Sequence, residues 1–189
     1  MKKMLLQIAA LTAISAVCAA LLAVACKMTE KPIADAAAKA EESAVRAVLP
    51  QAAAEVRRIG STADGRKVFA GIAASGETAG YALAGSDPSG YGGPVKLMVG
   101  FTPDFKVVSY KKLEAAETPG LGAKLTSPKF ADQFAGKDAA AGLKVTKDGG
   151  AIMPITAATI TSRAVCGAVN DACNALKAHL EPSGGERRK

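Results

Sequence analysis

The longest uncharged stretch of the chain runs from Met4 to Ala25, close to the start of the 189 residues. These 22 residues contain no acidic or basic side chain. As an α-helix the stretch would be roughly 33 Å long, enough to cross a hydrocarbon core of about 30 Å. The sequence therefore predicts one N-terminal transmembrane helix, followed by about 150 residues, which is the size of one ordinary domain.

The charges at the ends of this stretch indicate its orientation. Lys2 and Lys3 precede it, and a pair of lysines favours a cytoplasmic N-terminus, which puts the rest of the chain on the outer face of the membrane. A cleaved signal peptide and a lipoprotein signal ending at Cys26 remain as alternatives, because residues 23–26 loosely resemble a lipobox. Signal-peptide cores are usually shorter, about 7 to 15 residues, so we favour a retained anchor over residues 1–27.

The net charge of +7 does not indicate a nucleic-acid-binding surface. Lysines beside the apolar stretch and the basic tail at 183–189 carry most of the excess, and residues 28–182 hold 18 basic and 16 acidic side chains. Aromatic residues interleaved with basic ones, on which single-stranded nucleic acids stack, are missing as well. We therefore expect no nucleic-acid partner, and we expect the tail to be a disordered, solvated end.

The four cysteines do not predict a metal site. Cys18 and Cys26 belong to the apolar stretch or its edge, while Cys166 and Cys173 lie seven residues apart in a predicted helix. Seven helical residues span about 10.5 Å, too far for a disulfide within that helix. We expect buried, apolar thiols, no bound metal and no catalytic role for the sole histidine, His179.

The rest of the pattern predicts an α+β fold, with an antiparallel sheet covered by helices. Alanine-rich residues 33–49 should be helical as far as Pro50, within a helical linker over residues 28–60. Short apolar runs at close spacing indicate hairpins, and the core domain is expected over residues 61–182. The expected strands are 67–74, 79–84, 95–101 and 106–113, with weaker strands at 143–146 and 151–155; the expected helices are 128–134 and 162–180.

Two polar motifs stand out within this pattern. Residues 156–162 gather four hydroxyl side chains with small residues at a predicted helix start. Backbone N–H groups there lack intrahelical partners and the helix dipole is positive, so the place suits a phosphate group, and Thr159 is the first candidate. The loop from Glu117 to Ala123 contains two glycines and a proline, a combination that allows a backbone to approach a ligand closely.

Together these motifs resemble the RnfG family, the G subunits of the Rnf ion-translocating electron transport complex. The resemblance rests on the N-terminal membrane segment and on three motifs in the family's order: Gly90-Tyr91-Gly92-Gly93-Pro94, Glu117-Thr118-Pro119-Gly120-Leu121-Gly122, and Thr156-Ala157-Ala158-Thr159-Ile160-Thr161-Ser162. It covers most of the chain beyond the linker. The related C subunit of the sodium-pumping NADH:quinone reductase shares the flavin-binding domain but is usually longer.

The resemblance implies an electron carrier that acts within a larger membrane complex and is not a complete enzyme alone. Members carry FMN joined by a phosphoester to the last threonine of a Ser/Thr-Gly-Ala-Thr motif, attached by a separate flavin transferase that uses FAD. Matched to this chain, that hydroxyl belongs to Thr159, and the loop with Glu117 would lie against the flavin. The implied site comprises Thr156, Ala157, Ala158, Thr159, Glu117, Thr118, Gly120, Leu121 and Gly122.

The same resemblance implies the surroundings of the protein. The partners would be the integral membrane subunits of the complex, which passes electrons between ferredoxin and NAD and moves Na⁺ or H⁺. The domain would lie on the periplasmic side of a bacterial inner membrane. The chain itself offers no dinucleotide fingerprint and no cysteine set for an iron–sulfur cluster.

The chain departs from the family pattern at two places. Met153 and Ala157 stand where the family usually has Asp and Gly, and Ala115 and Ala116 stand where a histidine is often found. Two other functions remain open from the sequence. One is a lipid-anchored extracytoplasmic binding or scaffold protein, and the other is a flavin reductase that holds FMN noncovalently.

Overall fold

The computed structural model describes residues 2–181 and divides into two compact units between Ala40 and Glu41. The basic tail expected at 183–189 lies outside the described residues. Helix α1 runs from Lys2 to Val48, so its last two turns belong to the second unit. The part of α1 before Glu41 is the one described helix long and apolar enough to cross a membrane, and its large side chains, Leu6 for example, are exposed.

The second unit is built on a five-stranded antiparallel sheet in which each strand pairs with the next along the chain. This meander confirms the predicted α+β class. Four of the strands match the predicted apolar runs closely, because those runs alternate in the way a sheet requires. The strands are β1 (Ala53–Ser61), β2 (Lys67–Ala73), β3 (Thr78–Asp87), β4 (Val95–Phe101) and β5 (Val107–Glu114).

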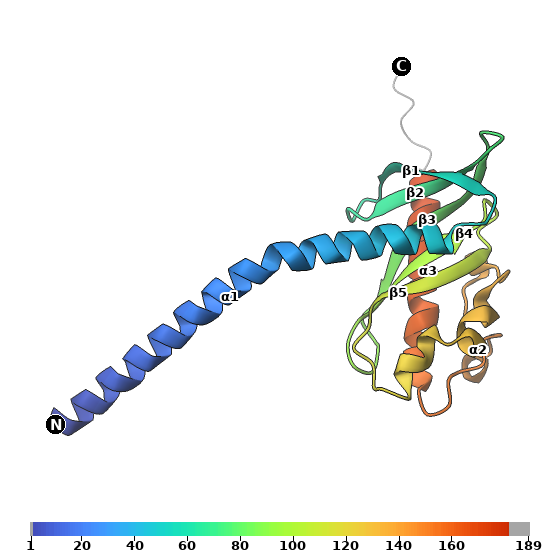
Figure 1. Cartoon of the computed structure of the whole chain (residues 1–189). Helices are drawn as coiled ribbons and strands as arrows, with labels where there is room; N and C mark the ends of the chain where they lie inside the picture. Colours follow the sequence, from blue (N-terminus) through green and yellow to red (C-terminus); the bar gives the residue numbers. More distant parts are fainter. Residues whose placement is uncertain (1, 182–189) are drawn as a thin grey trace, which may run out of the picture. The chain divides into compact units, whose positions relative to one another are not determined.

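Helices cover both faces of the sheet. Helix α3 (Thr159–Leu180) packs on one face, where the main core lies (Figure 1). The last turns of α1 pack on the other face with Val45 and Val48, followed by Leu49 just after the helix. Strand β4 is consequently buried on both sides: Leu97 and Met98, which point to opposite faces, are both fully inaccessible. The sequence pattern alone does not indicate burial on both faces, because the α1 turns that cover the second face lie far away in the chain.

Between β5 and α3 the chain forms short helical turns instead of a longer element. These are η1 (Gly122–Thr126), α2 (Pro128–Ala131), η2 (Asp132–Phe134), η3 (Ala139–Ala141) and η4 (Thr146–Asp148). The predicted helix over 128–134 corresponds to α2 and η2. Aromatic side chains anchor this region to the sheet: Phe134 packs edge-on against Tyr110 of β5, with ring centroids 5.3 Å apart, and the Tyr110 hydroxyl donates to the Leu125 carbonyl.

Three secondary-structure predictions need correction. Strand β1 lies in the range assigned to the helical linker; only Val56 and Ile59 are large and apolar there, and the strand forms by pairing with β2. Residues 143–146 and 151–155 form no strands and meet in one isolated bridge between Val145 and Ile152. Helix α3 begins at Thr159, three residues earlier than predicted.

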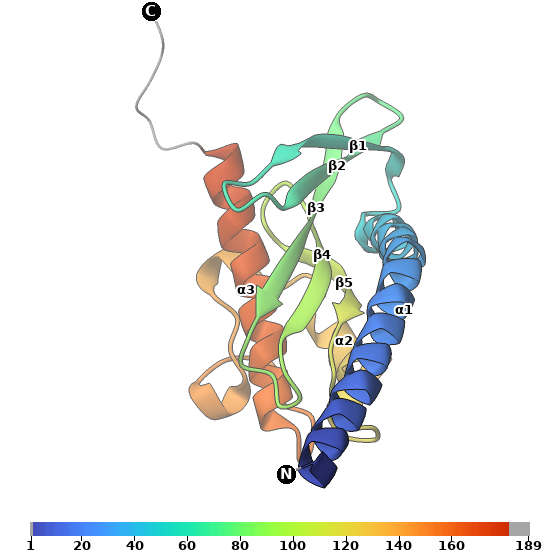
Figure 2. The same cartoon turned by 90° about the vertical axis from the view of Figure 1, so that its left-hand side faces the viewer.

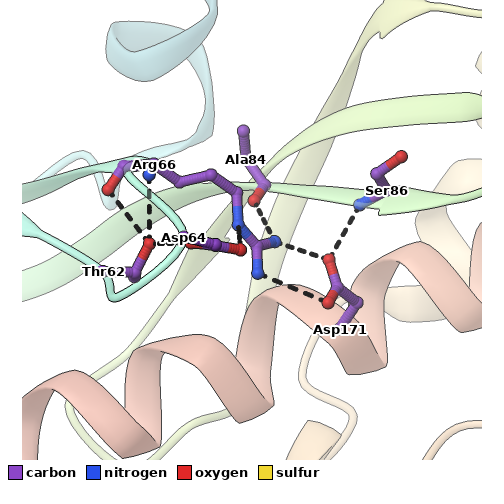
Figure 3. Close-up of polar contacts among 6 residues, drawn as sticks. All are labelled: Thr62, Asp64, Arg66, Ala84, Ser86 and Asp171. Carbon is purple, nitrogen blue, oxygen red and sulfur yellow. Dashed lines mark hydrogen bonds and ion pairs between the residues drawn. The ribbon is translucent and has the colours of Figure 1, made fainter.

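A polar cluster joins the β1–β2 hairpin to α3 (Figure 3). The Arg66 guanidinium donates to the Ala84 carbonyl at 2.9 Å and pairs with Asp171 of α3, whose carboxylate also accepts the Ser86 N–H at 2.9 Å. Asp64 lies 2.6 Å from Arg66 Nε. Hydrogen bonding from Arg66 lowers the pKa of Asp64 to about 2, so this carboxyl stays charged at acidities that protonate a free aspartate.

The cysteines of α3 are buried, as the sequence predicted. Burial raises the pKa of the Cys166 thiol to about 12, so this group is a neutral thiol at physiological pH. Among residues 2–181, no group of three or more His, Cys, Asp or Glu side chains is placed to hold a metal ion.

Candidate functional site

A cavity of about 430 Å³ lies at one end of the second unit. Three segments form it: the β3–β4 turn, the loop that follows β5, and the start of α3. Figure 2 shows these three segments side by side at the end of the sheet. The residues that line the cavity are Tyr91, Glu117, Thr118, Leu121, Gly122, Ala157, Ala158, Thr159, Ile160 and Thr161.

Thr159 is the first residue of α3 and is half-buried in the cavity wall. The first helical hydrogen bond runs from the Ser162 N–H to the Ala158 carbonyl, at 3.0 Å. The N–H groups before it have no helical acceptor, and the helix dipole adds a positive partial charge at the same end. Thr159 therefore presents its hydroxyl where an anionic group is stabilised.

A lysine from another part of the chain reaches the same hydroxyl. The Lys147 ammonium, on turn η4, donates to Thr159 Oγ1 at 3.3 Å. The next residue, Asp148, accepts two hydrogen bonds from Arg163 of α3, both at 2.7 Å. These two bonds connect η4 to the first turns of α3 and hold Lys147 beside Thr159.

The carboxylate of Glu117 connects all three segments of the cavity. One oxygen accepts the Tyr91 N–H at 3.0 Å and the Gly92 N–H at 3.5 Å, and the other accepts the Thr161 hydroxyl at 2.6 Å. Gly122 lies close enough that a Cβ there would be 2.3 Å from the Glu117 oxygen. Glu117 is thus a wall residue whose hydrogen bonds fix the shape of the cavity.

The segment before α3 turns sharply, and Ala157 adopts a left-handed backbone with φ of +61°. Ser162 fixes this turn: its hydroxyl accepts the Ile155 N–H and donates to the Ala158 carbonyl, each at 2.9 Å. Glycine adopts this conformation without the steric cost that alanine carries.

Replacing Ala157 by glycine is expected to stabilise the fold. Relief of the left-handed strain should raise the free energy of unfolding by about 1 kcal/mol, which corresponds to a Tm increase of about 2–4 °C for a domain of this size. Thermal unfolding of the full chain in detergent, followed by circular dichroism, measures the change.

Ala158→Gly is the matched control, because Ala158 has a φ of −135° and is buried. It should lower Tm, since the substitution removes a packed methyl and adds freedom to the unfolded chain. A decrease in Tm for Ala157→Gly, similar to that of the control, would contradict the strain argument.

Most residues of the site predicted from the sequence line this cavity, but two do not. Thr156 lines a neighbouring cavity of about 420 Å³, together with Met153 and Lys124. The left-handed turn at Ala157 directs Thr156 away from Thr159. Gly120, with a φ of +78°, lies outside the lining of both cavities and shapes the turn of its loop.

The structure adds residues that the sequence analysis left outside the site. Ile160 and Thr161 line the cavity, as does Tyr91, which belongs to the first motif, and Lys147 contacts the Thr159 hydroxyl. Tyr91 is 70% exposed and Ile160 47% exposed, so the rim of the cavity is apolar and open to solvent. No local pattern identifies Lys147, because it lies twelve residues before Thr159 in an otherwise ordinary turn.

The residues present fit an FMN group. The volume is in the range of ligand pockets, about 300–1,000 Å³, and the lining combines small residues with apolar side chains, as an isoalloxazine ring requires. The hydroxyl, the ammonium and the helix start suit the phosphate. The apolar side chains, which suit the ring, and the Thr159 hydroxyl, which suits the phosphate, line the same cavity, so both ends of FMN would find a partner there.

Comparisons with known proteins agree with this geometry. The model of the FMN-binding domain family matches residues 90–174, a range that contains every residue lining the cavity. The G subunit of an ion-translocating oxidoreductase complex from Methanosarcina acetivorans is 34% identical over 177 residues, which cover 90% of this chain and 93% of the relative. The G subunit of the Na⁺-translocating ferredoxin:NAD⁺ oxidoreductase complex of Acetobacterium woodii is 36% identical, with coverage of 83% and 84%.

A solved structure shares the fold. The crystal structure of NqrC from Shewanella oneidensis superposes with a TM-score of 0.52 at 22% sequence identity. The superposition covers 62% of this chain and 62% of the NqrC chain, so it spans less than two thirds of that structure. It supports the arrangement of sheet and helices described above.

Proposed function

Because this chain belongs to the family of G subunits of ion-translocating oxidoreductase complexes and contains an FMN-binding domain, we propose that it carries electrons through FMN attached covalently to Thr159. When bound, FMN supplies one- and two-electron redox chemistry. The protein then has to hold the ring, set its surroundings and leave one edge accessible. The observation that carries the proposal is the cavity that joins an apolar, open rim to the Thr159 hydroxyl at the start of α3.

Attachment through a phosphoester uses the Thr159 hydroxyl as the nucleophile. Its oxygen bonds to the phosphorus of FAD on the riboflavin side, the bond from that phosphorus to the bridging oxygen of the pyrophosphate breaks, and AMP leaves. The hydroxyl proton passes to a base on the flavin transferase that brings FAD. The resulting phosphodiester keeps one negative charge, which the helix start favours. The exposed rim formed by Tyr91 and Ile160 leaves the cavity open to the transferase.

The proposed setting is a membrane complex in the bacterial inner membrane. Helix α1 anchors the chain, its lysine pair remains in the cytoplasm, and the domain works on the periplasmic side with other integral membrane subunits. These partners pass electrons between ferredoxin and NAD while the complex moves Na⁺ or H⁺. The exposed rim of the cavity would let a redox group of a partner approach the flavin.

The experiment is co-expression of the full chain with a flavin transferase, followed by denaturing gel electrophoresis and imaging of flavin fluorescence. We expect a fluorescent band with the transferase and a dark band without it. A dark band under both conditions, with FMN recovered free from the denatured protein, would contradict covalent attachment. That result would instead indicate a protein that holds FMN noncovalently, as a flavin reductase does.

A further inference from the structure

We propose that Lys147 binds the phosphate group at Thr159 as its counter-ion, and that the Asp148–Arg163 pair positions it there. The proposal rests on the attachment of FMN proposed above. Lys147 lies outside every motif that carries the family resemblance, and only the fold brings it to Thr159. The observation behind the proposal is the 3.3 Å contact between the Lys147 ammonium and the acceptor hydroxyl.

The turn that carries Lys147 is held firmly in place. Val145 and Ile152, on either side of η4, are fully buried, and the Thr146 N–H donates to the Ile152 carbonyl at 2.8 Å. The turn closes with the Gly150 N–H donating to the Val145 carbonyl at 3.0 Å. Lys147 itself is exposed, so this firmly held turn presents a charged side chain to Thr159, which lines the cavity.

The local charges leave Lys147 available for an anion. Asp148 is the nearest acid along the chain, and Arg163 neutralises it through two parallel hydrogen bonds, a geometry that guanidinium and carboxylate groups favour. Hydrogen bonding from Arg163 lowers the pKa of Asp148, so the pair remains charged and intact at neutral pH. Among the salt bridges of residues 2–181, none includes Lys147; its hydrogen-bond partner is the neutral Thr159 hydroxyl.

A hydroxyl is a weak partner for an ammonium group. A phosphodiester formed at the same oxygen would carry a negative charge on its non-bridging oxygens and would be a stronger partner. Attachment at Thr159 therefore turns the contact with Lys147 into a charge-assisted one. The ammonium and the start of α3 would then act on one phosphate from two sides. The Asp148–Arg163 ion pair contributes to phosphate binding by holding Lys147 in position. It adds no net charge of its own, because the two charges cancel.

The test measures the rate of FMN attachment to the purified full chain in detergent, with a flavin transferase, FAD and magnesium. Removing the charge in Lys147→Gln should slow the initial rate about five- to tenfold, and Lys147→Arg should restore most of it. The wild-type rate should fall as salt is raised, while the Lys147→Gln rate should change little. Lys137→Gln is the matched control, because this lysine is exposed on another turn and, among the described residues, the hydrogen bond to Thr159 comes from Lys147. The rate of the Lys137→Gln variant should equal the wild-type rate.

A second readout does not depend on the transferase. In protein that has already acquired FMN, the phosphorus NMR signal of the phosphodiester should shift between wild type and Lys147→Gln, and should stay unchanged in Lys137→Gln. Arg163→Gln should also slow FMN attachment and shift the phosphorus signal, each by less than Lys147→Gln does. The reason is that Lys147 loses the ion pair that positions it but keeps its charge. This inference alone would be overturned if wild type and Lys147→Gln had equal rates, equal salt dependence and identical phosphorus signals. The proposed function would be overturned if the wild-type chain never acquired FMN.

Discussion

Thr159→Ala is expected to abolish covalent FMN completely. The substitution removes the one hydroxyl at the start of α3 that both lines the cavity and accepts from Lys147. The neighbouring hydroxyls cannot replace it: Thr161 donates to Glu117, Ser162 is buried in the turn before the helix, and Thr156 lines another cavity. After co-expression with a flavin transferase, the denatured variant should give no flavin fluorescence.

Two further variants make this result specific. Thr159→Ser keeps a hydroxyl at the same atom position and should retain a fluorescent band. Thr126→Ala removes an exposed threonine hydroxyl outside the cavity and should fluoresce like wild type. A fluorescent band from Thr159→Ala would show that another side chain is the acceptor, and it would contradict the assignment.

Gly85→Ala is expected to destabilise the fold strongly. Gly85 lies on β3 against α3, and a Cβ built there would be 2.0 Å from the Ala168 carbonyl oxygen and 2.8 Å from Ala172 Cβ. Because the first of these atoms is helix backbone, no rotamer change relieves the clash, and α3 would have to move away from the sheet. We expect a loss of about 3 kcal/mol in the free energy of unfolding, or a decrease in Tm of about 6–12 °C.

The control for Gly85→Ala is Gly76→Ala, at a hairpin glycine with a φ of +86° and open space around its Cβ. It carries only the cost of the left-handed backbone, about 1 kcal/mol. Both values come from thermal unfolding of the full chain in detergent. If Gly85→Ala costs no more than Gly76→Ala, the close packing of α3 on the sheet would be contradicted. Since α3 carries Thr159, the same displacement should also reduce FMN attachment in Gly85→Ala.

Elements with a regular apolar pattern could be predicted from the sequence. Strand β4 alternates along one face with Val95, Leu97 and Val99, and the prediction for this strand matches the structure residue for residue. Strand β1 could not be found in this way, since its two large apolar residues are three positions apart and its pairing depends on β2. The burial of Met98 was not predictable either, because it depends on the α1 turns that cover it.

The residues of the candidate site also divide into those that could be predicted from the sequence and those that could not. The motif residues around Thr159 and Glu117 were identifiable because hydroxyl, glycine and acidic residues cluster locally in the sequence. The helix start was predicted three residues too late, because the turn before α3, which the Ser162 hydroxyl fixes through Ile155 and Ala158, has no local pattern in the sequence. Lys147 reaches Thr159 only through the tertiary fold, so no local pattern could have placed it in the site.

Peptide mass mapping of native protein, purified from its own membranes, tests the central claim most directly. Trypsin cleavage after Lys147 and Arg163 releases the peptide Asp148–Arg163, which contains Thr156, Thr159, Thr161 and Ser162. The account predicts that this peptide carries the added mass of FMN less one water, and that fragmentation locates the addition at Thr159. A peptide found only in its bare form, or an addition on one of the other three hydroxyls, would contradict it.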